Sequence, residues 1–339
     1  MPDVIETACA TKDTAMKHGV VVVLFQATAA HLQNVFHLRK LCPSVVAVDN
    51  STAADMTIHT ALRSSGVDVI WNRNDGGIAG AFNRGFDALI QQGCNTVFLF
   101  DQDSQVDQQY FASMLQACAD IDSELYMLGP KVFDVNVKRY LPAHNVQRFS
   151  LVPVPVDTTD HGVLRCSCLI SSGTVLSAAT YQRLGPFDEG YFIDQVDTEY
   201  CFRANCRNVP IYINTSVTLL HELSKRTERK FLGRSITQWN MPPARQYYSA
   251  RNCFLITRMY GMRFPLMTLI NIITLQQIIS ILFFEQRKIQ KLLSLAAGLF
   301  DGLFKRKGPF DQRWPSLARY CAAHSASAPH PSFGKDVHA

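Results

Sequence analysis

The stretch Phe98-Leu99-Phe100-Asp101-Gln102-Asp103-Ser104 decides the fold and the kind of site that it carries. It ends an apolar run that begins at Thr96 and that predicts a buried β-strand. Two carboxylates follow this strand, with one residue between them. Ligands of open α/β sheets bind beyond the carboxyl ends of strands, and a hard divalent cation shared with a phosphate-bearing ligand fits such a pair of acids. The alternative is a solvated acidic turn, since Asp and Ser are ordinary turn residues.

The preceding segments alternate between apolar runs of strand length and stretches with helical spacing. Residues 19–25, 45–48 and 67–71 have the β-branched composition of strands, whereas residues 31–41 have helical spacing and stop before Pro43. Alternation of this kind predicts an α/β protein with a doubly wound sheet.

A glycine-rich segment, Asn-Arg-Asn-Asp-Gly-Gly-Ile-Ala-Gly-Ala-Phe-Asn-Arg-Gly, occupies residues 72–85. Glycines between a strand and a helix let backbone N–H groups approach a phosphate. The spacing matches neither a P-loop nor the dinucleotide fingerprint. Close packing of the helix on the sheet through small residues is the alternative interpretation.

Three acids lie within six residues at Asp194, Asp197 and Glu199. Helical periodicity begins at about Val196, which puts Asp197 in the first helical turn, where the helix dipole favours the anionic form. Asp194 is predicted to be the N-cap of this helix.

The composition suits one large α/β domain with an accessory region, since 47% of the 339 residues are hydrophobic. The net charge of +5 suits a phosphorylated ligand or an anionic membrane surface and gives no reason to expect a nucleic-acid partner. Among the ten cysteines, Cys166 and Cys168 are closely spaced, but no second pair would complete a zinc site with them. We therefore expect the cysteines to be reduced in a cytoplasmic protein. Residues 1–18 are polar and predict a flexible N-terminus without a signal peptide.

The chain resembles the inverting family 2 glycosyltransferases with the GT-A fold, and among them the bacterial rhamnosyltransferases of polysaccharide assembly, because its sequence motifs follow the same order. The resemblance covers roughly residues 19 to 305. Five blocks carry it: Val-Asp-Asn-Ser (48–51), Gly-Gly-Ile-Ala-Gly-Ala-Phe-Asn-Arg-Gly (76–85), Phe-Asp-Gln-Asp-Ser (100–104), the acidic segment 185–203, and Arg-Gln-Tyr-Tyr-Ser-Ala-Arg-Asn (245–252).

The resemblance implies a role for individual residues. Asp197 matches the catalytic base, with Asp194 as its rival, and Asp103 and His221 match ligands of a Mg²⁺ or Mn²⁺ ion. Asp49 matches the acid that recognises the nucleotide base. The full set implied to bind the nucleotide donor is Asp49, Asn50, Asn83, Arg84 and Asp101, and the candidates for further substrate contacts are Gly173, Asp194, Arg245 and Arg251.

The resemblance also implies the reaction. It is transfer of L-rhamnose from dTDP-L-rhamnose, with inversion, to a hydroxyl of a glycan or polyprenyl-linked acceptor. The product would be a cell-surface polysaccharide such as O-antigen, capsule or exopolysaccharide. One alternative keeps the fold with another UDP- or dTDP-hexose as donor, and another is a sugar-nucleotide-binding protein without activity.

The carboxyl-terminal third contains an uncharged run from Phe264 to Phe284, with basic residues on both sides. As one helix it would be about 31 Å long, enough to cross a bilayer. Positive charge on both sides favours helices seated on the cytoplasmic face of the membrane, and a soluble helical subdomain or dimer interface is the alternative. The predicted organisation is a flexible N-terminus (1–18), a GT-A catalytic domain (19–235), a helical and peripherally membrane-associated region (236–310) and a largely disordered tail (311–339).

Overall fold

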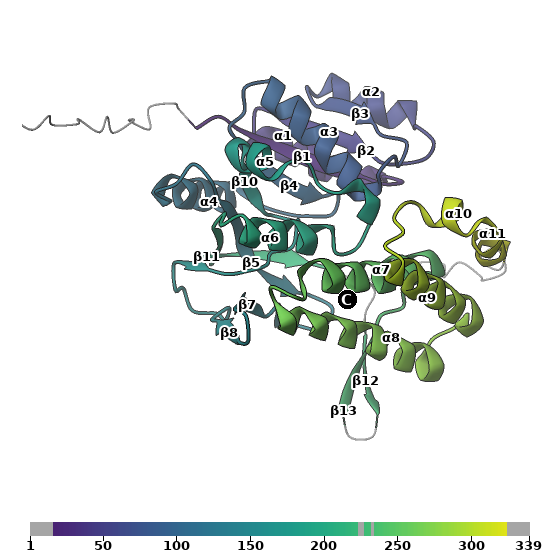
Figure 1. Ribbon diagram of the computed structural model, residues 1–339. Coiled ribbons are helices and arrows are strands. Elements are labelled where there is room, and N and C mark those ends of the chain that lie inside the picture. The colour runs from purple at the N-terminus through teal and green to yellow at the C-terminus, as the bar shows by residue number, and fades with distance from the viewer. Residues whose placement is uncertain (1–15, 223–226, 232–233, 324–339) are drawn as a thin grey trace, which may run out of the picture.

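A computed structural model describes residues 16–222, 227–231 and 234–323. Most of the predicted flexible N-terminus, residues 1–15, lies outside the described residues. The chain forms a central sheet covered by helices, and a second group of helices packs beside it (Figure 1).

The central sheet has nine strands and mixed direction. Strands β3, β2, β1 and β4 are parallel neighbours, whereas β10 runs antiparallel between β4 and β5. Strand β11 pairs in parallel with β5, and the short β6 pairs antiparallel with the C-terminal end of β5. The strand order is β3 (Asp68–Trp71), β2 (Val45–Asp49), β1 (His18–Leu24), β4 (Thr96–Asp101), β10 (Val175–Ser177), β5 (Met127–Asp134), β11 (Ile211–His221) and β9 (Val163–Arg165), with β6 (Arg139–Tyr140) off this path. The predicted α/β fold with a doubly wound mixed sheet is confirmed.

The sheet is buried on both faces. Alternate residues of β1 enter different cores: Val21 packs in one and Val20 in the other, because successive side chains of a strand point to opposite faces. Helix α3 packs closely on β1 at Gly85, where a β-carbon would collide with the side chain of Val21. The helices of this part are α1 (Ala29–Leu41), α2 (Met56–Ser64), α3 (Gly77–Gln91), α4 (Gln108–Asp120), α5 (Ala178–Leu184) and α6 (Val196–Cys206).

Two hairpins leave the main sheet. One joins β7 (Ala143–Val146) to β8 (Leu151–Val154). The other joins β12 (Thr227–Phe231) to β13 (Arg234–Gln238) and projects away from the helices (Figure 1).

The helical region begins with α7 (Pro243–Tyr260), and residues 264–284 do not form one continuous α-helix. A 3₁₀-helix (Pro265–Ile270) precedes α8 (Asn271–Phe284), and α9 (Lys288–Leu303) follows. Among the described residues, no helix is both long and apolar enough to cross a membrane. The predicted disordered tail also needs correction, because α10 (Phe310–Arg313) and α11 (Pro315–Ala323) are helical and Phe310 and Cys321 are buried. Residues 324–339 lie outside the described part of the chain.

Candidate active site

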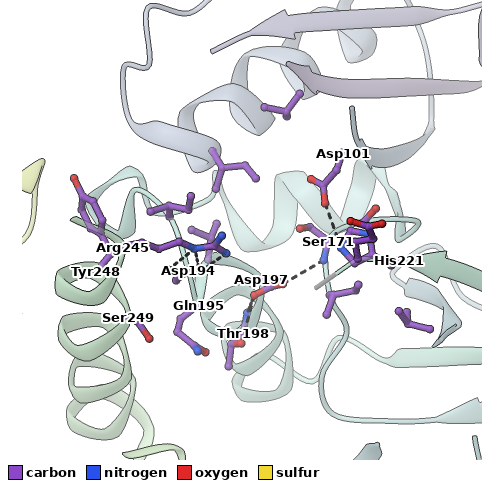
Figure 2. Close-up of a pocket in the computed structure, with 18 of the residues that line it drawn as sticks. Asp101, Ser171, Asp194, Gln195, Asp197, Thr198, His221, Arg245, Tyr248 and Ser249 are labelled. Atoms are coloured by element: carbon purple, nitrogen blue, oxygen red, sulfur yellow. Dashed lines mark hydrogen bonds and ion pairs between the residues drawn. The ribbon is translucent and has the colours of Figure 1, made fainter. Parts of the chain in front are cut away.

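A cavity of about 910 Å³ lies where β4 and β11 end and where α6 and α7 begin. Figure 2 shows Asp101, His221 and Asp197 on one side of it and Arg245 with Asp194 on the other. Asp101, Asp103, Asp194 and Asp197 therefore meet at one edge of the sheet, as expected for ligand sites of α/β folds, whereas Glu199 is buried in an ion pair with Arg203.

Asp101, Asp103 and His221 form a cluster able to hold a metal ion. One ligand atom from each lies within 4.8 Å of the others, and the Nε2 atom of His221 is 3.6 Å from Oδ2 of Asp101. Burial raises the pKa of Asp101 to about 6, and the charges of Asp103 and Asp197 act in the same direction, whereas His221 opposes them. Two carboxylates and an imidazole are a donor set that fits Mg²⁺ or Mn²⁺, and a cation would remove the repulsion that this cluster carries.

The turn that carries the two aspartates is held by polar side chains. Gln102 accepts a hydrogen bond from the backbone N–H of Phe25 (2.9 Å) and donates one to its carbonyl (3.2 Å). Asn34 of α1 donates to the carbonyls of Gln102 and Ser104. These contacts fix the acidic turn relative to the end of β1 before any ligand binds.

Asp197 lies in the first turn of α6 and accepts hydrogen bonds from the backbone of Thr198 (2.8 Å) and Ser171 (3.3 Å). Both bonds favour the anion, but burial is the larger effect and raises the pKa of this carboxyl. The helix dipole therefore does not set its protonation as expected from the sequence. A carboxylate that is costly to keep charged is a strong proton acceptor.

Asp194 does not cap α6, which corrects the prediction from sequence. Gln195 is the N-cap residue, and its side chain makes no capping hydrogen bond. Both oxygens of Asp194 instead accept hydrogen bonds from Arg245, at 2.9–3.1 Å. The charge of Asp194 raises the pKa of Arg245, so this ion pair places a fixed cation in the wall of the cavity opposite the acidic cluster.

The segment that leads into Asp197 is backbone-strained. Phe192, Asp194 and Gln195 all have positive φ, between 61° and 66°, which costs about 1–3 kcal/mol for each residue that is not glycine. Asn252 of α7 donates to the carbonyls of Tyr191, Ile193 and Asp194.

Two further residues hold the same segment, which we call the 190–195 loop. Arg251 donates to the carbonyls of Gly190 and Tyr191. The N–H of Ile78, at the start of α3, donates to the carbonyl of Phe192, and a β-carbon on the neighbouring Gly77 would collide with that oxygen.

Four of the residues predicted to contact a ligand lie outside the lining of the cavity. These are Asn83, Arg84, Gly173 and Arg251. Asn83 and Arg84 bind Glu189, Gly173 packs against the hydroxyl of Tyr110, and the guanidinium of Arg251 is fully buried against the 190–195 loop. In the glycine-rich segment, Gly77 and Gly85 serve close packing, whereas Asn74 and Ile78 of the same segment line the cavity.

The predicted nucleotide residues Asp49 and Asn50 differ in position. Asn50 lines the cavity. Its neighbour in sequence, Asp49, is buried and pairs with His59, and Oδ2 of Asp49 lies 2.7 Å from Nε2 of His59. The other oxygen of Asp49 accepts the N–H of Ser51. Recognition of the nucleotide base by Asp49 stays a prediction. No sequence pattern singled out His59, which is an ordinary helical residue of α2.

Comparison with known proteins agrees with this geometry. The sequence profile described as "Glycosyl transferase family 2" matches residues 20–172. Residues 20–172 therefore match a glycosyl transferase family 2 domain. The matched residues contain the acidic turn. They also include Ser171, whose backbone N–H donates a hydrogen bond to Asp197.

A curated relative and two solved structures extend the likeness beyond the family 2 domain. The "dTDP-rhamnosyl transferase RfbF" of Shigella flexneri is 29% identical over 218 residues, which are 63% of this chain and 70% of that protein. GalNAc-T7, crystallised with UDP, GalNAc and Mn²⁺, superposes with a TM-score of 0.52 at 14% identity, over 91% of this chain and 58% of that one. TarS of Staphylococcus aureus superposes with a TM-score of 0.50 at 15% identity, over 92% of this chain and 53% of that one. The fold is therefore that of GT-A glycosyltransferases, and the family 2 match together with the curated relative supports a glycosyltransferase.

Proposed function

We propose that this enzyme transfers L-rhamnose from dTDP-L-rhamnose to a hydroxyl of a glycan or lipid-linked saccharide, with inversion at the sugar carbon. The observation that carries the proposal is that Asp197, a buried carboxylate, shares one cavity with the Asp101–Asp103–His221 cluster and with Arg245. The choice of donor is supported by the relative named as a dTDP-rhamnosyl transferase.

Asp101, Asp103 and His221 would hold a divalent cation, Mg²⁺ or Mn²⁺. Bound there, it would stabilise the negative charge of the donor diphosphate and of the leaving nucleotide. Asn50 and Asp101 line the cavity and are the donor contacts that we retain. Arg245, held in place by Asp194, is a second positive group near the acidic cluster and suits an anionic part of either substrate.

Asp197 would accept the proton of the acceptor hydroxyl. A hydroxyl is a poor nucleophile until a carboxylate removes its proton, and the raised pKa of Asp197 makes it a better base than an exposed aspartate. One base and one displacement, from the side of the sugar opposite the leaving nucleotide, give inversion. Because the backbone N–H groups of Ser171 and Thr198 fix the carboxylate, it needs little rearrangement to act.

The test is a donor screen with the purified full-length chain, following nucleotide release from dTDP-L-rhamnose and from UDP- and dTDP-hexoses. We expect dTDP-L-rhamnose to be turned over fastest. Preference for another hexose donor would keep the glycosyltransferase and replace the sugar, which is the first alternative. No release from any donor, with or without saccharide acceptors, would favour a binding protein without activity.

A cytoplasmic location at the inner face of the membrane is part of the same proposal. A polyprenyl-linked acceptor would lie there, and the helices of residues 236–310 supply the surface that the following inference concerns.

A further inference from the structure

Helix α8 has its polar side towards the protein and its apolar side towards solvent. Gln277 and Ser280 are fully buried, and Gln277 donates to the hydroxyl of Ser249 on α7 (2.9 Å). Ile272, Leu275 and Leu282, in contrast, are each 46–56% exposed. Their spacing of three and seven residues puts them on one face of the helix. A helix on the surface of a water-soluble domain normally shows the reverse arrangement.

Helix α9 repeats this inversion. Lys291 and Asp301 are buried, Lys291 on the carboxylate of Glu285 (2.6 Å) and Asp301 on the hydroxyl of Tyr247 (2.7 Å). The outward positions are apolar, with exposed fractions between 42% and 64%, and are Ile289, Leu293, Phe300 and Leu303. Two consecutive helices thus carry an exposed apolar stripe, and they pack on each other and on α7 through Ile281, Leu295 and Ala250.

The exposed charges of the sequence span that contains these two helices are of one sign. Between residues 239 and 310 the sequence contains two acids, Glu285 and Asp301, and both are buried. The exposed charged residues of the same span are all basic: Arg258, Arg263, Lys288, Lys305 and Arg306. The guanidinium of Arg306 lies over the ring of Phe300 (5.3 Å), so one of these cations borders the apolar stripe of α9 directly.

We propose that the outward faces of α8 and α9 dock on the surface of an anionic lipid bilayer. The apolar side chains would enter the boundary between headgroups and acyl chains, and the surrounding cations would contact lipid phosphates. The charge pattern favours lipid over a second copy of the chain, because two copies would bring basic faces together. The helices would lie on the membrane, since neither is long enough to span it.

The position of the cavity agrees with docking at this face. Ile273 and Gln277 of α8 line the cavity, while Ile272, the neighbour of Ile273, belongs to the exposed stripe. A docked α8 would therefore be at once a wall of the cavity and a contact to lipid. Delivery of an acceptor on a lipid carrier rests on the proposed function, whereas docking itself does not.

The test is flotation of the full-length chain with vesicles of pure phosphatidylcholine and with vesicles that contain one-third phosphatidylglycerol. We expect binding to the anionic vesicles to be at least about tenfold tighter, because each cation near such a surface favours binding. The variant Leu275→Gln/Leu282→Gln/Leu293→Gln should lose about tenfold or more of this binding. The matched control is Phe149→Gln/Val152→Gln, which removes exposed apolar side chains from the β7–β8 hairpin and should bind as the wild type does.

A second variant decides the matter if the first does not fold, as judged by circular dichroism. Arg263→Gln/Lys288→Gln/Arg306→Gln changes exposed side chains and should abolish the preference for anionic vesicles. Wild type that fails to bind these vesicles, or variants of both kinds that bind unchanged, would overturn the proposal. So would a wild-type dimer in light scattering that the apolar variant converts to monomer without any effect on lipid binding.

Discussion

At the scale of single residues, two aspartates three positions apart have been given opposite tasks by their surroundings. Both oxygens of Asp194 accept hydrogen bonds from Arg245, so this carboxylate is already engaged by a cation. Asp197 has backbone N–H donors but no cation, and burial raises its pKa. The proposed base, Asp197, therefore differs from Asp194 chiefly in that no arginine among the described residues binds its carboxylate, and less in its position on the helix.

Replacement of Asp197 by Asn should lower turnover by roughly 10²–10⁴-fold, the usual contribution of general-base catalysis. Donor KM should change little, because Asp101, Asp103 and His221 remain. Steady-state kinetics of donor turnover with acceptor would measure both. If Asp197→Asn were near normal and Asp194→Asn inactive, the base would be Asp194.

The pH profile separates the two aspartates further. Because burial raises the pKa of Asp197, its proton-accepting form is lost at a higher pH than for an exposed aspartate, so kcat/KM should rise with pH through that raised pKa. Asp194→Asn leaves Asp197 in place but removes a charge that raises the pKa of Asp197, so this variant should keep an acidic limb that is moved somewhat to lower pH. A profile that is flat down to the ordinary aspartate range would contradict the assignment of Asp197 as base.

The acidic cluster makes a prediction that does not depend on activity. Mg²⁺ or Mn²⁺ at a hundredfold excess over its Kd should stabilise the folded chain by about 2.7 kcal/mol. Thermal unfolding with and without the cation would measure this, and Asp103→Asn should abolish the shift. Asp122→Asn, at an exposed acid after α4, is the matched control and should keep it. An equal shift in both variants would mean that the cation binds elsewhere.

At the scale of elements, the 190–195 loop joins α3, α6 and α7. Asn252 alone donates to three of its carbonyls, and these contacts offset part of the cost of three left-handed residues. The strain is thus held by an element that lies some fifty residues further along the chain. We regard Asn252 as a residue that positions Asp197 without touching substrate.

Asn252→Ala should destabilise the chain by roughly 1–3 kcal/mol, since it leaves buried carbonyls without donors, and should also lower kcat. Donor KM should stay near the wild-type value because the acidic cluster is independent of the loop. Asn205→Ala is the control, since Asn205 likewise donates to two carbonyls, of Ser167 and Cys201, outside the loop. A comparable loss of stability in both variants, with no difference in kcat, would reduce Asn252 to an ordinary stabilising residue.

The elements that sequence predicted best are those whose signal is local. The β4 strand, its acidic turn and the first turn of α6 follow from a short apolar run and from helical periodicity, so Asp101, Asp103 and Asp197 were found and do share the cavity. The partner of Asp194 was missed because Arg245 lies 51 positions away, and no local pattern records an ion pair across that distance.

The residues assigned by matching blocks show the opposite error. Asn83 and Arg251 lie in motifs of the right order, but their side chains bind loop carbonyls and not the cavity. A match to a motif does not distinguish a side chain that holds the fold from one that contacts a ligand. The uncharged run was expected to form helices packed on the catalytic domain, and within it α8 begins at Asn271.

At the scale of the whole molecule, the helical region and the sheet share a core. Leu255, Ile256 and Tyr260 of α7 belong to the same apolar cluster as Val21 and Leu99 of the sheet. On its other side α7 packs closely on α9, where a β-carbon on Gly298 would collide with the carbonyl of Tyr247. The proposed boundary at residues 235 and 236 thus divides the chain by composition and does not divide its core.

A shared core predicts that the sheet and the helical region unfold together. Calorimetry of the full-length chain should give one transition whose calorimetric and van't Hoff enthalpies agree. Leu255 lies at the contact between the two parts. The variant Leu255→Ala should lower the free energy of unfolding by about 2–5 kcal/mol, as is typical of a buried leucine, and should leave a single transition. Two separated transitions in the wild type would show that the parts fold independently. In that case α7, which supplies both Arg245 and Asn252, would belong energetically to only one of them, and the site would depend on their docking.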